Sequence, residues 1–366
     1  MQSAITSLQA LRALAALLVL FAHLHQLEAR FLPEPLLGAA WLLGFGGVDL
    51  FFVISGFVMV YITRNAPRGH GGVVGRFVYA RAARVYPAYW LFSLLALGAY
   101  LLIPDTLTRN VSDLHLWQSF TLWPIAGDLP VLHVGWTLSH ELYFYLVFAG
   151  FLALPARWLP ALLTVWGGLA TVFWVVLPAP GALAGLLTHP LTLEFILGAF
   201  AGLLVCSGRR AFAVPALVLA AVWLAGAAVW LWPAGTEDFP LGWQRVAAFG
   251  VPSALVVYGA VCLEADRGLT APQWLVRLGD WSYSLYLSHL LVLSALARIW
   301  AGLMPATGPA GNLAFILVAI IACIAVAWAS YRGFELPVLN ATRRLGSRLF
   351  TVPPRTGSPA MASRIW

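Results

Sequence analysis

The sequence predicts an all-α polytopic membrane protein with about ten transmembrane helices and both termini in the cytoplasm. The first observation is composition: 61% of the 366 residues are hydrophobic and only 10% are charged, against roughly 45–50% and about 25% in soluble domains. The second is that apolar runs of about 20 residues, each long enough to cross a bilayer as a helix, recur along the chain. A soluble helical bundle would need polar faces at the helical period, and these runs lack them.

The apolar runs are separated by turn-forming residues, which set the ends of the candidate spans. Breaks such as LPEP at 32–35, LPARWLP at 154–160 and LPAPG at 177–181 contain proline or glycine. We expect the first run to be a retained span instead of a cleaved signal peptide, because no basic side chain precedes Arg12, which lies inside the run. The candidate spans are 6–27, 38–63, 78–102, 135–154, 158–178, 185–206, 212–233, 245–264, 281–302 and 312–332.

The distribution of arginine predicts the orientation of these spans. All 21 basic residues are Arg, and most fall on alternate connections, which the positive-inside rule assigns to the cytoplasm. The longest external connection is then 103–134, and its Trp- and Leu-rich part, 114–124, is expected to lie at the membrane interface. The predicted cytoplasmic arginines are Arg64, Arg68, Arg76, Arg81, Arg84, Arg157, Arg209, Arg210, Arg267, Arg277, Arg332, Arg343, Arg344, Arg348, Arg355 and Arg364.

Charged and ionisable side chains inside the spans are the candidate functional groups, because each charge costs about 2.5–3.5 kcal/mol on insertion scales. Arg12 and His23 are eleven positions apart, which places them within roughly 20° of each other around a helix and roughly 16 Å apart along it. The predicted orientation gathers cationic groups at the inner edge and acid–base groups in the outer half. The intramembrane set is Arg12, His23, His25, Asp49, His140, Glu141, His189, Glu194 and His289.

Each of these groups also has a purely structural explanation. Arg12 can extend to the cytoplasmic headgroups, and Arg81 and Arg84 can serve only as topology signals. A lone histidine such as His23 is usually a packing residue, and a glutamate in the first turn of a span, as at 141 and 194, can cap a helix.

Metal and phosphate-loop chemistry are not indicated. The stretch HELYF lacks the second histidine of an H-E-x-x-H pair, because Phe144 occupies that position. Cys206, Cys262 and Cys323 are scattered through apolar runs without metal-ligand spacing. The net charge of +7 comes without a basic, aromatic-interleaved block, so no nucleic-acid partner is expected.

Five blocks together resemble the integral-membrane acyltransferase 3 family, across residues 6–340. They include the Arg12-to-His23 spacing, the R-x-x-R pair at Arg81 and Arg84, and the Trp136, Glu141 and Tyr145 pattern. Within the family, the 46–59 and 135–138 stretches are most similar to the exopolysaccharide-production branch. The blocks are LQALRALAALLVLFAHLH (8–25), GGVDLFFVISGFVM (46–59), RFVYARAARVYPAYW (76–90), WTLSHELYFYLVF (136–148) and SYSLYLSH (282–289).

The resemblance implies transfer of an acyl group, most often acetyl, from cytoplasmic acyl-CoA to a hydroxyl of a surface glycan in the bacterial inner membrane. It implies that His23 is the general base or a transient acyl carrier, oriented by Glu141, with Arg12 at the entrance. Arg81 and Arg84 would bind the CoA phosphates. The residues expected to play secondary polar roles in the site are Asp49, Tyr145, Trp136, Glu194 and His289. No permanently bound cofactor and no metal are expected.

The resemblance leaves several points open. His140 stands where that branch commonly has an aromatic residue, so His140 is either neutral or adjusts acceptor choice. The acyl group (acetyl, succinyl or longer), the acceptor sugar and the oligomeric state are not specified. Residues 1–340 form the expected acyltransferase domain, and residues 341–366 are expected to be a basic, disordered cytoplasmic tail. A transporter of a lipid-linked sugar or an anion, and a non-catalytic scaffold, are the alternatives.

Overall fold

The computed structural model describes residues 5–68, 71–102, 114–177, 181–231, 242–303 and 308–350. Every regular element within these ranges is a helix. The chain divides into two compact units, whose boundary falls inside helix α2 (Gly46–Thr63). The α1 unit comprises the described residues of Ile5–Ile54 and Gly208–Gly333, and the α5 unit comprises those of Ser55–Ser207 and of the segment from Phe334 to Phe350.

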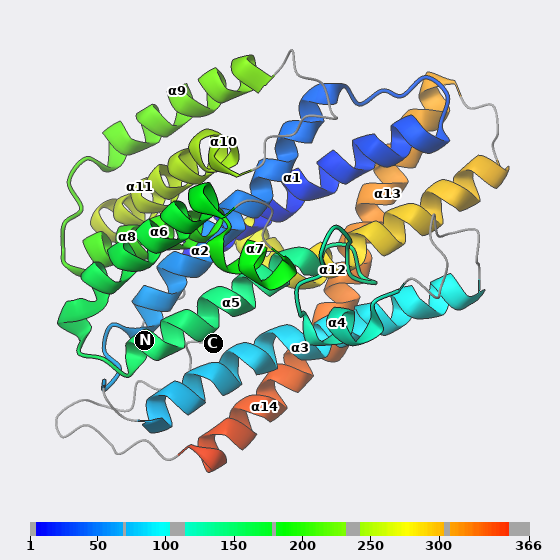
Figure 1. The fold of residues 1–366 in the computed structure, drawn as a ribbon. Helices are drawn as coiled ribbons and strands as arrows, with labels where there is room; N and C mark the ends of the chain where they lie inside the picture. Colours follow the sequence, from blue (N-terminus) through cyan, green and yellow to red (C-terminus); the bar gives the residue numbers. More distant parts are fainter. Residues whose placement is uncertain are drawn as a thin grey trace. The chain divides into compact units, whose positions relative to one another are not determined.

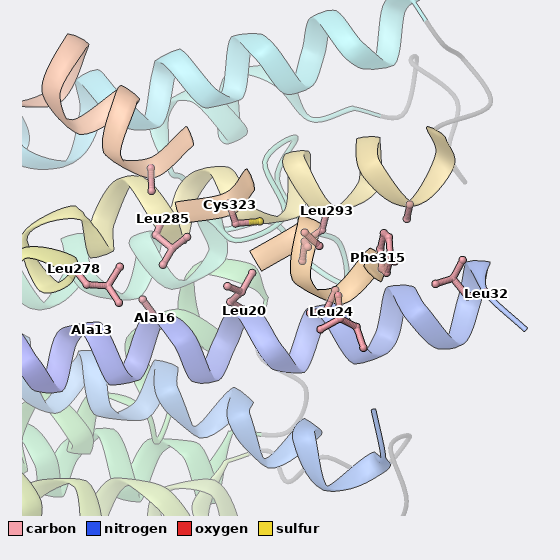
Figure 2. Close-up of a cluster of buried hydrophobic side chains, with 14 residues drawn as sticks. Ala13, Ala16, Leu20, Leu24, Leu32, Leu278, Leu285, Leu293, Phe315 and Cys323 are labelled. Carbon is pink, nitrogen blue, oxygen red and sulfur yellow. The ribbon is translucent and has the colours of Figure 1, made fainter. Parts of the chain in front are cut away.

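The α1 unit is built around three long helices, α1 (Thr6–Phe31), α12 (Gln273–Leu303) and α13 (Pro309–Ser330). Figure 2 shows its core, where Leu20 and Leu24 of α1 meet Leu285 and Leu293 of α12 and Phe315 of α13. Apolar residues at intervals of three and four form this face of α1. The unit is completed by η1 (Ala39–Phe45), α9 (Ala213–Leu231), α10 (Trp243–Arg245), the π-helix η6 (Val246–Gly250) and α11 (Val251–Arg267), which packs on α9.

The α5 unit places α3 (Gly71–Leu102) against both α5 (Gly135–Leu152) and α14 (Leu336–Leu349) (Figure 1). Its core is aromatic: the Phe144 ring stacks on Phe195 at a centroid distance of 4.6 Å and on Trp166 at 5.6 Å. Offset stacking of this kind stabilises cores beyond the burial of area. The remaining elements are α4 (Leu116–Thr121), η4 (Ala156–Trp158), α6 (Leu159–Val176), α7 (Ala182–Thr188), α8 (Thr192–Cys206) and the π-helix η7 (Tyr331–Glu335), which straddles the unit boundary.

The predicted class, an all-α polytopic membrane protein, is confirmed. Nine helical segments in the described part of the chain are long and apolar enough to span a membrane, and they match nine of the ten predicted spans. The tenth, 135–154, forms helix α5, whose His, Glu, Ser, Thr and Tyr residues lower its mean hydropathy, and α5 is not among the nine. Many large apolar side chains are exposed, as expected of surfaces that face lipid. The placement of both termini in the cytoplasm stays a prediction.

Several boundaries differ from the sequence-based expectation. Helices α3 and α12 begin at Gly71 and Gln273, seven and eight residues before the predicted spans 78–102 and 281–302. The span predicted at 185–206 is divided into α7 and α8. The break contains Pro190, which has no backbone N–H to donate to the preceding turn of a helix. Residues 341–349, expected to be disordered, belong to helix α14, which is anchored on α3 where the Tyr79 hydroxyl donates a hydrogen bond to the Thr342 carbonyl at 3.0 Å. The rest of the expected tail, 351–366, lies outside the described residues.

Close helix packing at glycines, expected for the stretch 44–57, is present in the structure. A Cβ at Gly47 would overlap the carbonyl of Ala15 in α1. We predict that Gly47→Ala lowers the free energy of unfolding by about 1–3 kcal/mol, because the two backbones would have to separate. Unfolding by sodium dodecyl sulfate in mixed micelles measures this change.

Gly98→Ala in α3 is the matched control, because a Cβ there meets no heavy atom within 4 Å. We expect this second substitution to be neutral or to stabilise by up to about 1 kcal/mol, since alanine is the better helix former. Equal losses in both variants would contradict packing at Gly47 as the cause.

Candidate functional site

Arg12 and His23 lie on one unbroken helix, α1, so the predicted spacing of the two side chains applies without a kink. The Arg12 guanidinium donates through Nη1 to the Gln9 side-chain oxygen at 3.3 Å, and the Gln9 amide donates to Asp280 Oδ1 of α12 at 3.0 Å. Arg12 is therefore linked to α12 as well as positioned on α1.

His23 contacts His289, which the sequence predicts only as a secondary polar residue. His23 Nδ1 lies 3.1 Å from His289 Nε2 and 2.9 Å from the Val19 carbonyl. His289 Nδ1 lies 2.8 Å from the Tyr286 carbonyl, and the His289 side chain is almost completely buried. The structure thus joins the first and the last of the five sequence blocks through two imidazole rings.

The carbonyl partners fix which ring nitrogens carry protons. A carbonyl oxygen can only accept, so His289 Nδ1 must donate to Tyr286, and His289 Nε2 of the neutral ring is then an acceptor. His23 Nδ1 therefore donates to His289, and it faces the Val19 carbonyl with the same proton. The basic nitrogen of neutral His23 is consequently Nε2, the atom that a general base would use.

Asp49 is neutralised by a buried ion pair inside the α1 unit. Arg245 donates through Nε to Asp49 Oδ1 at 2.8 Å and through Nη2 to Asp49 Oδ2 at 2.9 Å. The aspartate is fully buried and the arginine is 5% exposed. This two-point geometry is the strongest that an arginine and a carboxylate can form. It gives Asp49 a structural partner and attaches α2 to α10.

Glu141 belongs to a polar network in the α5 unit. Ser55 Oγ donates to Glu141 Oε1 at 2.8 Å, and the Tyr145 hydroxyl, one helical turn further along α5, donates to the same oxygen. The buried Arg81 guanidinium lies 5.7 Å from the centre of the Tyr145 ring and 5.9 Å from that of Phe77. The network joins predicted site residues from two blocks. The pairing of Glu141 with His23 involves both units and stays a prediction.

Arg84, predicted to bind phosphate, forms an ion pair with Glu335. The Glu335 side chain is 2% exposed and the Arg84 side chain 22% exposed. Glu335 comes from the π-helical turn before α14, which explains why the local sequence around Arg84 gave no sign of it. A phosphate at Arg84 would therefore have to share the guanidinium with a buried carboxylate.

The polar residues predicted for the spans 135–154 and 185–206 also lie in the α5 unit, on a different side of α5 from Glu141, at the C-terminal end of α7, or on α8. Trp136 and His140 are one turn apart with ring centroids at 5.9 Å, and the His140 ring meets His189 edge-on at 4.9 Å. Glu194 is fully buried in the first turn of α8, where a carboxylate is stabilised by the positive end of the helix. The role of Glu194 stays a prediction.

Three residues that form hydrogen bonds or ion pairs with predicted site residues were not identified from the sequence: Arg245, Glu335 and Ser55. Each is paired with a predicted site residue by tertiary contact, so spacing along the chain gives no signal for it. Only Arg245 offered a hint, since an arginine directly before an apolar run calls for a partner. In the described part of the chain, no group of three or more His, Cys, Asp or Glu side chains could hold a metal ion.

Comparison with known proteins places this arrangement in context. A family model described as an acyltransferase domain matches residues 5–332. The exopolysaccharide production protein ExoZ of Rhizobium meliloti (strain 1021) is 32% identical over 322 residues, covering 84% of this chain and 93% of that protein. Acyltransferase MdmB of Streptomyces mycarofaciens is 30% identical, covering 86% of this chain and 87% of that protein.

A third relative, nodulation protein 10 of Rhizobium leguminosarum bv. viciae, is 27% identical over 383 residues, which cover 93% of this chain and 95% of that protein. The chain therefore aligns with most of the length of all three relatives. No solved structure matches the chain.

Proposed function

The chain belongs to the acyltransferase 3 family, and we propose that it is an O-acyltransferase that moves an acyl group, most often acetyl, from cytoplasmic acyl-CoA to a sugar hydroxyl of an exopolysaccharide or another cell-surface glycan. Family membership makes it a multi-pass membrane acyltransferase and favours the enzyme over the transporter and scaffold alternatives. The glycan acceptor is proposed because one relative carries the name exopolysaccharide production protein. A bacterial inner-membrane location follows from the use of a cytoplasmic donor.

The observation that carries the proposal is the His23–His289 pair. With Nδ1 of His23 donating to His289, Nε2 is the basic nitrogen of the neutral ring, and it would remove the proton of a sugar hydroxyl. The oxygen attacks the thioester carbonyl, a C–O bond forms, and the C–S bond breaks. The imidazolium then returns its proton to the departing CoA sulfur, so the ring ends in its starting state.

In this proposal the acyl donor is held by arginines. CoA carries phosphates, and guanidinium groups bind phosphate with strong, directional hydrogen bonds. Arg81 and Arg84 lie three positions apart on α3, and Arg12 would line the path of the pantetheine arm. Glu141 would balance the imidazolium charge, and its two hydroxyl donors, Ser55 and Tyr145, orient its side chain.

The experiment that tests the function is isotope transfer. Membranes containing the protein are incubated with acetyl-CoA labelled in the acetyl group, and label is measured in the glycan and in CoA. The proposal expects alkali-labile label in the glycan that depends on the protein. Label that stays on CoA with acetyl-, succinyl- and longer acyl-CoA donors, with the protein folded and present, would contradict it.

We predict that the double variant Arg81→Ala/Arg84→Ala raises KM for acyl-CoA by roughly a hundredfold or more, because each arginine loses a charge-assisted hydrogen bond worth about 1.5–3 kcal/mol. The turnover number at saturating donor should change much less. Initial rates at varied acyl-CoA concentration measure both constants. Arg157→Ala is the control, because Arg157 is exposed in η4 and is predicted to lie on the same side of the membrane.

Glu335→Gln separates phosphate binding from a structural role of Arg84. The substitution removes the competing negative charge but keeps a hydrogen-bond acceptor, so a phosphate-binding Arg84 predicts a lower KM for acyl-CoA. An unchanged KM in Glu335→Gln, together with an unchanged KM in a folded double-alanine variant, would remove both arginines from the donor site.

A further inference from the structure

The α5 unit contains a pocket that the proposed chemistry has not used. The pocket has a volume of about 280 Å³. Its walls come from the 122–130 connection before α5, from the first two turns of α5, and from α7 with His189. The volume is near the lower end of the roughly 300–1,000 Å³ of small-molecule pockets. It fits a single small ring better than an extended coenzyme.

The wall formed by the 122–130 connection is held in place by α3. Three side chains on α3 donate to carbonyls at the end of α4: Tyr86 to Thr121 at 2.9 Å, Tyr89 to Ser119 at 2.6 Å, and Trp90 to Phe120 at 2.8 Å. Leu122 and Gly127 have positive φ angles, which turn the chain at the start and in the middle of the connection. A pocket whose wall is anchored in this way binds its ligand with little loss of conformational entropy.

The pocket lining combines aromatic rings with hydrogen-bonding groups. Trp123 and Trp136 supply the rings, and Asp128, Ser139, His140 and His189 supply polar atoms. The backbone N–H of Leu191 donates to His189 Nδ1 at 3.2 Å, so the neutral His189 ring carries its proton on Nε2 and can donate from there. Asp128 and Ser139 add acceptors.

This chemistry matches a sugar ring. A pyranose has apolar C–H faces, which pack on indole rings, and a rim of hydroxyls, which need both donors and acceptors. The donor CoA fits poorly, because its phosphates require cations, and among the described residues that line the pocket none is Arg or Lys, whereas one is Asp. Since the connection that forms the pocket is predicted to be external, a surface glycan could reach it.

We propose that this pocket binds a sugar ring of the acceptor glycan, with Trp123 as the aromatic platform and His140 as a specificity-determining residue; this rests on the proposed acyltransferase function. Trp136, Ser139 and His140 recur at intervals of three and four along α5, so they share one face of the helix. Glu141 is about 100° further round and meets Ser55 and Tyr145 instead. The neighbouring residues His140 and Glu141 thus have separate tasks.

The test measures sugar binding without an acyl donor. Full-length protein in detergent micelles is titrated with the methyl glycosides of glucose, galactose and mannose, and binding is followed by saturation-transfer difference NMR. We expect Trp123→Ala to raise the dissociation constant of the bound glycoside about tenfold, the loss of one aromatic contact. Trp123→Phe, which keeps a ring, should recover most of the affinity. His140→Phe should change the preference among the three glycosides.

Trp117→Ala is the matched control: Trp117 belongs to the same segment, its ring lies 6.0 Å from Trp123, and it is exposed and does not line the pocket. This variant should bind like the wild type. No binding of any glycoside by the wild type, or equal dissociation constants for Trp123→Ala and Trp117→Ala, would overturn the pocket assignment.

Labelled-acetyl transfer, measured in parallel, separates this proposal from the proposed function. Glycoside binding that depends on Trp123 in a protein that transfers no acyl group leaves the pocket standing and removes the function. If Trp123→Ala transfers the acetyl group with an unchanged KM for the acceptor, the proposed function stands and the pocket assignment is removed. Competition identifies the source of the sugar: displacement by a polyprenyl-phosphate-linked sugar or by water-soluble polysaccharide fragments supports the pocket and names the acceptor form, and displacement by neither contradicts it.

Discussion

Replacement of His23 by alanine is expected to lower the turnover number for acyl transfer by roughly 10²–10⁴-fold, the usual contribution of a positioned general base. The expectation rests on the hydrogen bond from His23 Nδ1 to His289, which leaves Nε2 as the basic nitrogen. KM for acyl-CoA should change little, because the predicted donor contacts are arginines. Single-turnover and steady-state rates of labelled-acetyl transfer, at matched amounts of folded protein, measure the loss.

The matched control is His25→Asn, two residues further along α1. His25 Nδ1 lies 2.7 Å from the Leu37 carbonyl, a contact with the loop after α1, so this variant should keep the wild-type turnover number. A His23→Asn protein with undiminished turnover would remove His23 from the role of base. Equal losses in the His23 and His25 variants would indicate damage to α1 instead of lost chemistry.

His289 is predicted to be a positioning residue for His23, and substitutions of His289 test the same mechanism independently. His289→Gln can place an amide oxygen near the position of Nε2 and keep an acceptor for His23, whereas His289→Leu cannot. We expect the leucine variant to lose roughly 10²-fold in turnover, since the wrong tautomer of a catalytic histidine is strongly impaired, and the glutamine variant to keep most of it. A purely packing role for His289 would make the two variants similar, with no change in the pH profile of the rate.

The fold class and the placement of Arg12 and His23 on one helix could be predicted because both depend on local patterns. Span length and apolar content identify transmembrane helices directly, and the Arg12-to-His23 spacing survives in α1 because nothing interrupts the helix. Helix α5 is not among the nine helices that are apolar enough to count as spans. The polar residues that point to function in WTLSHELYFYLVF are the same residues that lower its hydropathy.

Tertiary pairing could not be predicted from the sequence. Asp49 and Arg245 are separated by 196 positions, and Arg84 and Glu335 by 251. A charge within a span calls for a partner, but composition does not say which one. The same limit applied to His140, whose contact with His189 forms only when α7 folds against α5. The sequence left open whether His140 is neutral or adjusts acceptor choice. Because His140 lines the pocket, sugar binding to the pocket now tests this point.

Asp49→Ala is expected to lower the free energy of unfolding by about 3–5 kcal/mol, the cost of leaving a buried charge without its partner. Arg245 would lose both of its short hydrogen bonds to the carboxylate while remaining in a site where it is 5% exposed. Because Arg245 ends α10 and the π-helix η6 follows it directly, we expect α10 and η6 to loosen first. Unfolding by sodium dodecyl sulfate in mixed micelles measures the change in free energy.

Two further variants decide whether the buried pair or the mutated position is responsible for that loss. Asp266→Ala removes one partner of the exposed Arg210–Asp266 ion pair in the same unit, at 3.2 Å, and should cost only about 0–1 kcal/mol. The double variant Asp49→Leu/Arg245→Met replaces both charges by apolar groups of similar size and should recover most of the stability, because the desolvation cost of both ions disappears. If the double variant is as unstable as Asp49→Ala yet Asp266→Ala is neutral, the ion pair contributes more than mutual neutralisation. The hydrogen-bond geometry between α2 and α10 would then be what the fold requires.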